Sequence, residues 1–259
     1  MRGLIAVICL AFAGWAHASS YVSEISDLWY APGEDGWGVN MVLQKNVAFA
    51  TFYVYDANRN PVWFTAILDY APGYVFSGNL YADRGPWYGG TYDSATVTER
   101  QAGQATFTLA SLDHATLSYT IDGVTVTKAL QRLTFTAEDY SGSYTGGFTV
   151  KATECTPSSL NHSENVLVRQ TVSQIGSAFS LSMTRTDNSV DTTCTLDGTY
   201  SQTGKLGAVA GSYSCTSGSY GSFSLVEMTP TISGFTARAS GHNQYCQWSG
   251  YIGGVRPAQ

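Results

Sequence analysis

Short segments rich in β-branched and aromatic residues recur about every ten residues from Ile25 to the C-terminus, with turn-forming residues between them. None of these segments places its apolar residues at the period of a helix. Asp122-Gly123 is the strongest hairpin signal, because this dipeptide favours the tight turn that joins two antiparallel strands. The pattern therefore predicts an all-β protein. In the first half of the chain the expected strands are 37–44, 47–56, 62–68, 74–81, 90–98, 104–109, 115–121 and 124–135.

The composition of the chain changes at residues 136–139. The tryptophan-rich part lies before this point, whereas the cysteines that follow the N-terminal leader lie after it. We therefore expect two domains, 19–137 and 138–259. The second divides into eight segments of strand length, which favours an up-and-down barrel because closure of a sheet removes its exposed edges. These segments are 141–152, 165–173, 177–185, 191–200, 206–215, 220–228, 231–240 and 244–253.

Each half of the chain begins with an aromatic-rich segment, residues 27–30 in the first and 140–144 in the second. An aromatic residue on the first strand resembles the opening of lipocalin and avidin-like barrels. The expected fold is therefore all-β, with two consecutive antiparallel up-and-down barrel-like units of calycin-like architecture.

Residues 1–18 have the features of an export signal. Arg2 supplies a short basic start, residues 4–15 form an apolar run, and residues 16–18 give the small-x-small cleavage pattern. We expect a signal peptide over 1–18, export to the periplasm or beyond, and no transmembrane segment in the mature chain, because no later segment could span as a helix. A porin-like barrel is disfavoured, since segments such as 195–200 lack an apolar lipid-facing row.

Four cysteines remain after the leader, and an even number of thiols in an oxidising compartment favours two disulfide bonds. A turn at residues 204–205 would pair position i with position 409 − i, since 204 + 205 = 409, which sets Cys194 opposite Cys215. In a closed barrel the first strand lies antiparallel to the eighth, which brings Cys155 to Cys246. We expect these two disulfides, the second of which would tie the barrel shut. A metal site is the alternative, but the sequence contains no Cys-x-x-Cys spacing.

The chain has 13 Lys and Arg against 19 Asp and Glu, a formal net charge of −6, and no basic cluster. Because phosphate binding depends on Lys and Arg, nucleic acid is not an expected partner. His114, His162 and His242 remain after the leader, and no two of them have the spacing of metal ligands. We therefore expect neither a metal site nor a cofactor.

Residues 29–40 carry the pattern W-x-x-P-x-E-x-G-W-G-x-N, and Tyr-Asp at 55–56 and Pro-x-Trp at 61–63 follow it. Together with residues 211–215 and 250–255, these motifs resemble a family of uncharacterised exported proteobacterial proteins. The resemblance covers most of the mature chain. It implies export and an all-β fold, and it implies no particular reaction.

Neighbouring residues on a strand point to opposite faces of the sheet. The strands expected at 47–56 and 62–68 carry apolar side chains on both faces, so exposure of either face to solvent would leave an apolar patch. We therefore expect their outer face to be covered by the second barrel, by another subunit in a homo-oligomer, or by a ligand. Alternation over 37–44 places Trp37 inside the first barrel.

The leading hypothesis is an exported binding protein without catalysis, in which aromatic side chains hold a carbohydrate or another small flat ligand at the rim of the first barrel. One alternative is a hydrolase or lyase that acts on an extracellular polymer, with Glu34, Asp56 or a tyrosine as acid or base. Another is a structural subunit of an envelope or extracellular assembly. The candidate ligand-binding residues are Trp29, Glu34, Asn40, Gln44, Tyr55, Trp63 and Trp87.

Overall fold

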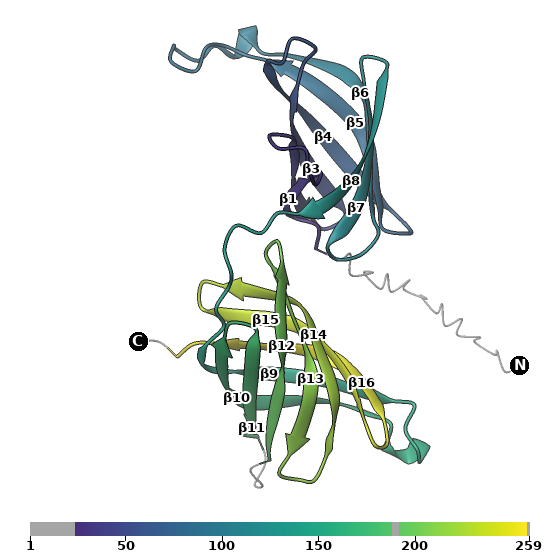
Figure 1. The fold of residues 1–259 in the computed structure, drawn as a ribbon, viewed down its shortest axis with the longest axis vertical. Helices are drawn as coiled ribbons and strands as arrows, with labels where there is room; N and C mark the ends of the chain where they lie inside the picture. Colours follow the sequence, from purple (N-terminus) through teal and green to yellow (C-terminus); the bar gives the residue numbers. More distant parts are fainter. Residues whose placement is uncertain (1–23, 188–191, 258–259) are drawn as a thin grey trace, which may run out of the picture.

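The computed structural model describes residues 24–187 and 192–257, which form two consecutive closed β-barrels (Figure 1). In each barrel, strands that follow one another in the sequence are neighbours in the sheet, and the last strand pairs with the first. This confirms the expected all-β fold with two antiparallel up-and-down barrels. The expected signal peptide lies outside the described residues. Within the described residues, no helix is both long and apolar enough to cross a membrane.

The first barrel differs from expectation between its fifth and sixth strands. Most of the segment 90–98 is loop, because the Asp93 side chain accepts a hydrogen bond from the Ala95 amide and caps a short 3₁₀ helix. The expectation of a strand there was wrong. The elements are β1 (Asp27–Tyr30), β2 (Gly38–Gln44), β3 (Val47–Tyr55), β4 (Pro61–Ala71), β5 (Val75–Arg84), η1 (Ser94–Thr96), β6 (Thr98–Leu109), β7 (His114–Ile121) and β8 (Val124–Arg132).

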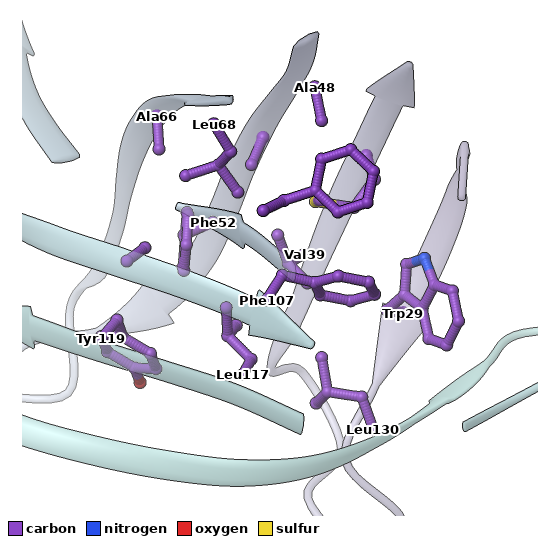
Figure 2. Packing of buried hydrophobic residues seen from close by; sticks show 14 of the residues in the cluster. Trp29, Val39, Ala48, Phe52, Ala66, Leu68, Phe107, Leu117, Tyr119 and Leu130 are labelled. Carbon is purple, nitrogen blue, oxygen red and sulfur yellow. The ribbon is translucent and has the colours of Figure 1, made fainter. Parts of the chain in front are cut away.

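The interior of the first barrel is filled by large apolar side chains (Figure 2). Trp29 is 0% exposed and packs edge-to-face on Phe107 with ring centroids 5.1 Å apart. Phe107 in turn packs on Phe76, and Phe52 packs on Tyr119. These contacts exclude water from the barrel axis, so the first barrel is a solid core and its outer surface carries the features available to a ligand.

The second barrel is held by the two expected disulfides. Cys194 lies directly opposite Cys215 in the β12–β13 register, and Cys155 bonds to Cys246. Both pairings are confirmed. The elements are β9 (Gly142–Thr153), η2 (Ser158–Leu160), β10 (His162–Ile175), β11 (Ala178–Arg185), β12 (Thr193–Thr203), β13 (Leu206–Cys215), β14 (Tyr220–Thr231), β15 (Gly234–Asn243) and β16 (Gln247–Val255).

The end of the second barrel that faces the first is closed by aromatic packing. Tyr140 donates a hydrogen bond to the Met228 carbonyl at 3.0 Å, and Tyr144 donates one to the Tyr140 carbonyl at 2.6 Å. The Phe235 ring packs edge-to-face on both tyrosines. Because each buried hydroxyl has a partner, these tyrosines fill the core without an unsatisfied polar group.

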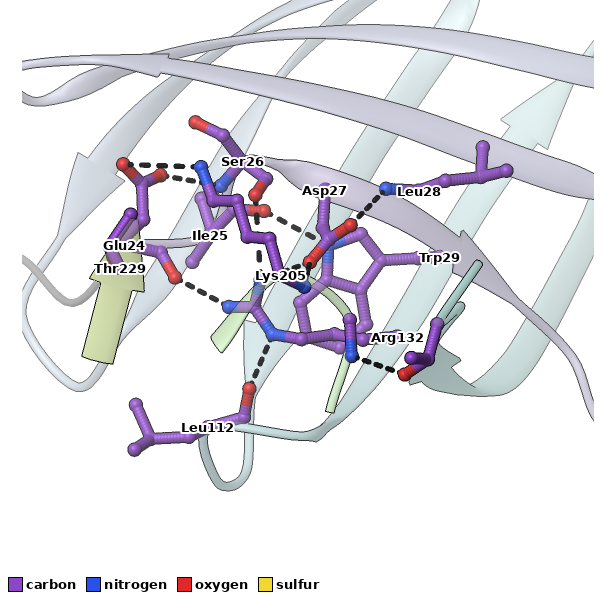
Figure 3. A network of polar contacts seen from close by, with 12 residues as sticks. Glu24, Ile25, Ser26, Asp27, Leu28, Trp29, Leu112, Arg132, Lys205 and Thr229 are labelled. Carbon is purple, nitrogen blue, oxygen red and sulfur yellow. Dashed lines mark hydrogen bonds and ion pairs between the residues drawn. The ribbon is translucent and has the colours of Figure 1, made fainter. Parts of the chain in front are cut away.

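A turn of the second barrel docks on the base of the first (Figure 3). The turn between β12 and β13 places the Gly204 amide 2.7 Å from the Thr134 hydroxyl and the Lys205 amide 3.0 Å from the Asp27 carboxylate. Asp27 also pairs with Arg132, whose side chain is fully buried. The connection 133–141, which contains the expected boundary at 137/138, runs between the two barrels beside this contact.

Candidate functional site

The outer surface of β2, β3 and β4 carries apolar side chains that face solvent. On β3, Phe52 and Val54 point into the core and are buried, whereas Tyr53 on the opposite face is 48% exposed. On β4, Trp63 is 51% exposed. We call this surface the aromatic face and define it by Val42, Val47, Phe49, Tyr53, Tyr55, Trp63 and Ile67.

Strand register arranges the aromatic face in rows. Tyr53 pairs with Gly38 on one side and with Trp63 on the other. The rings of Tyr53 and Trp63 therefore lie side by side on adjacent strands, whose backbones are about 4.8 Å apart. On the other side of Gly38 lies β1, where Tyr30 follows Trp29, the residue paired with Val39 of β2. Because Gly38 has no side chain, a depression remains between Tyr30 and Tyr53.

This depression is part of a groove of about 320 Å³. Its walls are formed by the β1–β2 turn and by the outward side chains of β1 and β3. Gly33 and Gly36 in the turn have φ values of +84° and +85°, which glycine adopts without strain. At Gly36, a Cβ atom would lie 2.4 Å from the Tyr55 hydroxyl. The glycines thus allow the turn to lie close over the aromatic rings.

Trp37 forms the inner wall of the groove and is fixed on two sides. Its ring stacks on Tyr119, and its Nε1 donates a hydrogen bond to the Tyr119 hydroxyl at 3.3 Å. The Lys128 ammonium lies 5.7 Å from the centroid of the Trp37 ring and forms an ion pair with Glu34. A cation beside the ring face, balanced by a carboxylate, holds the turn against the barrel.

A row of polar side chains lies next to the Tyr53–Trp63 pair. Asn40 pairs with Thr51, and Thr51 pairs with Thr65. Thr65 pairs with Tyr81 on β5, and its hydroxyl donates a hydrogen bond to Asp83 Oδ2 at 3.1 Å. The end of the aromatic face that holds Tyr53, Tyr55 and Trp63, which we call its distal part, is therefore bordered by hydroxyl, amide and carboxylate groups.

The structure brings some of the predicted ligand residues together and separates others. Glu34 lines the groove, and Tyr55 lies against Gly36 in its wall. Trp63 lies on the adjacent strand, paired with Tyr53 of the groove lining, and Asn40 lies in the polar row. Three residues do not join them. Trp29 is buried in the core, Gln44 lies at the opposite end of β2, and Trp87, 69% exposed, packs on Tyr88 in the β5–β6 loop.

Trp29 therefore offers no ring face to a ligand, because its side chain is 0% exposed, with Arg132 over the ring at 4.5 Å and Phe107 packed against it edge-to-face. It was expected among the ligand-binding residues at the rim of the first barrel, but the structure places it in the core instead. The expectation missed Tyr30, Tyr53 and Asp83. The turn at residues 45–46 could have indicated Tyr53, since 45 + 46 = 91 pairs position 38 with position 53.

The acids proposed for catalysis both have structural partners. Glu34 pairs with Lys128. Asp56 accepts hydrogen bonds from the Asn60 side chain and from the Asn58 and Asn60 amides, which close the β3–β4 turn. The Asn60 hydrogen bonds hold the pKa of the Asp56 carboxyl below its usual value, so it stays ionised and is a poor proton donor near neutral pH.

A serine, an aspartate and a histidine also meet in the β6–β7 turn. Asp113 Oδ1 lies 2.9 Å from His114 Nδ1, and Ser111 Oγ lies 3.5 Å from the same nitrogen. In a Ser-His-Asp triad the serine and the aspartate lie at opposite ring nitrogens. This group is therefore a turn motif. Within residues 24–187 and 192–257, no group of three or more His, Cys, Asp or Glu side chains is arranged to hold a metal ion.

No protein-family model matches the chain, and neither a curated protein nor a solved structure matches it. Barrels of this kind serve many functions, so the chemistry of the exposed side chains is what indicates a function. On the first barrel those side chains are paired aromatic rings, a groove beside them and a border of hydrogen-bonding groups.

Proposed function

We propose that this protein is an exported, non-catalytic binding protein that holds a carbohydrate chain on the distal part of the aromatic face. The observation that carries the proposal is the cross-strand pair Tyr53–Trp63, with both rings about half exposed beside the groove. The N-terminal export features and the two disulfides support export, because disulfides persist in oxidising compartments.

The chemistry of the surface suits a sugar. The faces of aromatic rings carry partial negative charge, which attracts the C–H groups on the flat side of a pyranose. Asn40, Thr51 and Thr65 line up beside the rings, so that hydroxyl groups at the sugar edge can form hydrogen bonds. The combination of an apolar platform with a few placed polar groups is typical of ligand sites.

The strands hold these groups in place before a ligand arrives. Tyr53, Trp63 and the polar row all lie on a closed barrel whose interior is fully packed. A rigid surface loses little conformational entropy on binding. Because the carboxylates of Glu34 and Asp56 are engaged in structural contacts, binding rather than hydrolysis is the function that these residues support.

The test is retention of the purified mature chain on insoluble cellulose, chitin and xylan, followed by calorimetry with oligosaccharides of the retaining polymer. We expect Trp63→Ala to weaken binding at least tenfold, which corresponds to about 1.4 kcal/mol. Trp87→Ala is the matched control, because it removes an exposed tryptophan outside the row, and it should bind like the wild type.

Thermal unfolding of both variants confirms that the fold is intact. Retention of the wild type by none of the polymers would contradict the proposal. Equal binding by the Trp63→Ala variant would remove the aromatic face from the site.

A further inference from the structure

The two ends of the second barrel are packed differently. At the end facing the first barrel, Tyr140, Phe235 and Met228 are at most 2% exposed and fill the interior. At the far end, a cavity of about 230 Å³ remains inside the barrel, lined by side chains from all eight strands. The far end is the one that carries the disulfides.

The cavity is lined mainly by aromatic and aliphatic groups. Trp248 packs edge-to-face on Phe148 at 5.8 Å and on Tyr213 at 5.9 Å between ring centroids. These three side chains are only partly buried, although they point into the barrel. A ligand that covers this apolar surface removes it from water, which favours binding. Deeper in the cavity lie Met183, Leu196, Leu225 and Ile252.

The cavity mouth is fixed by covalent bonds. Cys194 and Cys246 both line the cavity, and each is bonded to a cysteine on a neighbouring segment. The Asn243 side chain accepts hydrogen bonds from the Tyr245 and Cys246 amides, which fixes the β15–β16 turn at the rim. A cavity held open in this way requires little ordering when a ligand binds.

The charged groups at the rim are paired within the protein. Glu164 forms an ion pair with Arg185 at 3.1 Å and lies 3.8 Å from His162. A charged ligand would lose its hydration in the apolar interior without gaining a free counter-ion at this rim, which is costly. The lining therefore favours an uncharged ligand, with any hydroxyl group directed to the mouth.

We propose that the far end of the second barrel is a separate binding site for a small uncharged aromatic molecule. An apolar cavity of roughly 150 Å³ holds benzene. The larger volume here, about 230 Å³, accommodates one ring with one or two small substituents. The site does not depend on the carbohydrate surface of the first barrel, because its lining comes entirely from the second.

The test uses the full mature chain with ¹³C-labelled methionine methyl groups and p-cresol as the probe. Met183 lines the cavity, whereas Met41 and Met228 are buried in cores outside it and serve as internal controls. We expect p-cresol to shift the Met183 signal saturably and to give nuclear Overhauser contacts to that methyl alone. The charged analogue 4-methylbenzoate should bind at least tenfold more weakly.

Two substitutions of equal size locate the site. Ala239→Leu adds bulk inside the cavity, and Ala210→Leu adds it to the exposed face of β13. The first should weaken p-cresol binding at least tenfold, and the second should leave it unchanged, as should Trp63→Ala in the first barrel.

If Ala239→Leu does not fold, the Overhauser contacts in the wild type still decide the matter. Absence of a saturable Met183 shift up to the solubility of p-cresol would overturn the proposal. Contacts to Met41 or Met228 in place of Met183, or equal binding of 4-methylbenzoate, would do so as well.

Discussion

The backbone amide of Lys205, in the second barrel, donates a 3.0 Å hydrogen bond to the Asp27 carboxylate of the first. The same carboxylate oxygen accepts a hydrogen bond from Arg132 Nη1 at 3.1 Å. The Arg132 side chain is fully buried, and this burial lowers its pKa, although the hydrogen bond with Asp27 opposes the shift. One carboxylate thus joins the turn of one barrel to a buried cation of the other.

Gly204 is the residue that lets the turn approach so closely. Its φ is +58°, and a Cβ atom there would lie 2.1 Å from Asp27 Oδ2 and 2.9 Å from Arg132 Cβ. We expect Gly204→Ala to lower the free energy of unfolding by about 2 to 5 kcal/mol, the sum of left-handed backbone strain and overpacking. Urea unfolding measures this loss. Limited proteolysis should also show faster cleavage in the connection 133–141.

Gly176 provides the matched control for this substitution. It lies in the β10–β11 turn with φ +60°, and a Cβ atom there would have no neighbour within 4 Å. Gly176→Ala should therefore cost only the backbone strain, about 1 to 2 kcal/mol. Equal losses for the two variants would show that the contact between the barrels contributes nothing to the effect at Gly204.

The protein should lose stability at alkaline pH because the Tyr200 hydroxyl is buried. Its hydroxyl donates a hydrogen bond to Gln202 at 2.9 Å, and burial raises its pKa from 10.0 to about 12. Between these values the folded state keeps a proton that the unfolded state has lost, so stability is complete below pH 10 and falls as pH rises toward 12.

Urea unfolding between pH 9 and pH 12 checks this pH dependence. Tyr200→Phe should unfold more readily at neutral pH but lose less stability over the alkaline range, because it has no proton to release. An alkaline slope identical to that of the wild type would assign the effect to other tyrosines, such as Tyr140, whose pKa burial also raises.

The disulfides should differ in what they contribute. Cys155–Cys246 closes a loop of 91 residues, and Cys194–Cys215 closes one of 21. A longer loop removes more entropy from the unfolded chain, so we expect losses of about 4.6 and about 3.3 kcal/mol respectively on the loop-length relation. Unfolding of the two double Cys→Ala variants measures the difference. A larger loss for the shorter loop would contradict the entropic account.

The fold and the disulfides could be predicted from the sequence because short turns fix strand register. Once residues 204–205 are placed in a tight turn, Cys194 must face Cys215, and the structure has this pair. The failure at 90–98 has the opposite cause. Asp93 forms a local side-chain hydrogen bond that competes with strand pairing. The residue pattern does not show which of these two arrangements of the backbone is more stable.

The candidate sites were harder to predict because they depend on how completely side chains fill the interior of each barrel. Alternation along a strand indicates that Trp248 points inward, but it does not indicate whether the space beside it is filled. In the first barrel Trp29 is fully buried by its neighbours, whereas in the second Trp248 lines a cavity. Such differences arise from the packing of side chains from eight strands, which the register between pairs of strands does not determine.

The aromatic face also makes a prediction about assembly. A stable interface buries about 800 Å² on each partner and uses about 20 to 30 residues a side. The aromatic face has seven exposed apolar side chains, and the polar row Asn40–Thr51–Thr65 crosses it. We therefore expect the chain to sediment as a monomer at protein concentrations of tens of micromolar, and we expect the Trp63→Ala variant to sediment in the same way. A dimer that Trp63→Ala dissociates would instead assign the face to a subunit contact, because the same ring cannot be buried against a partner and stack on a sugar.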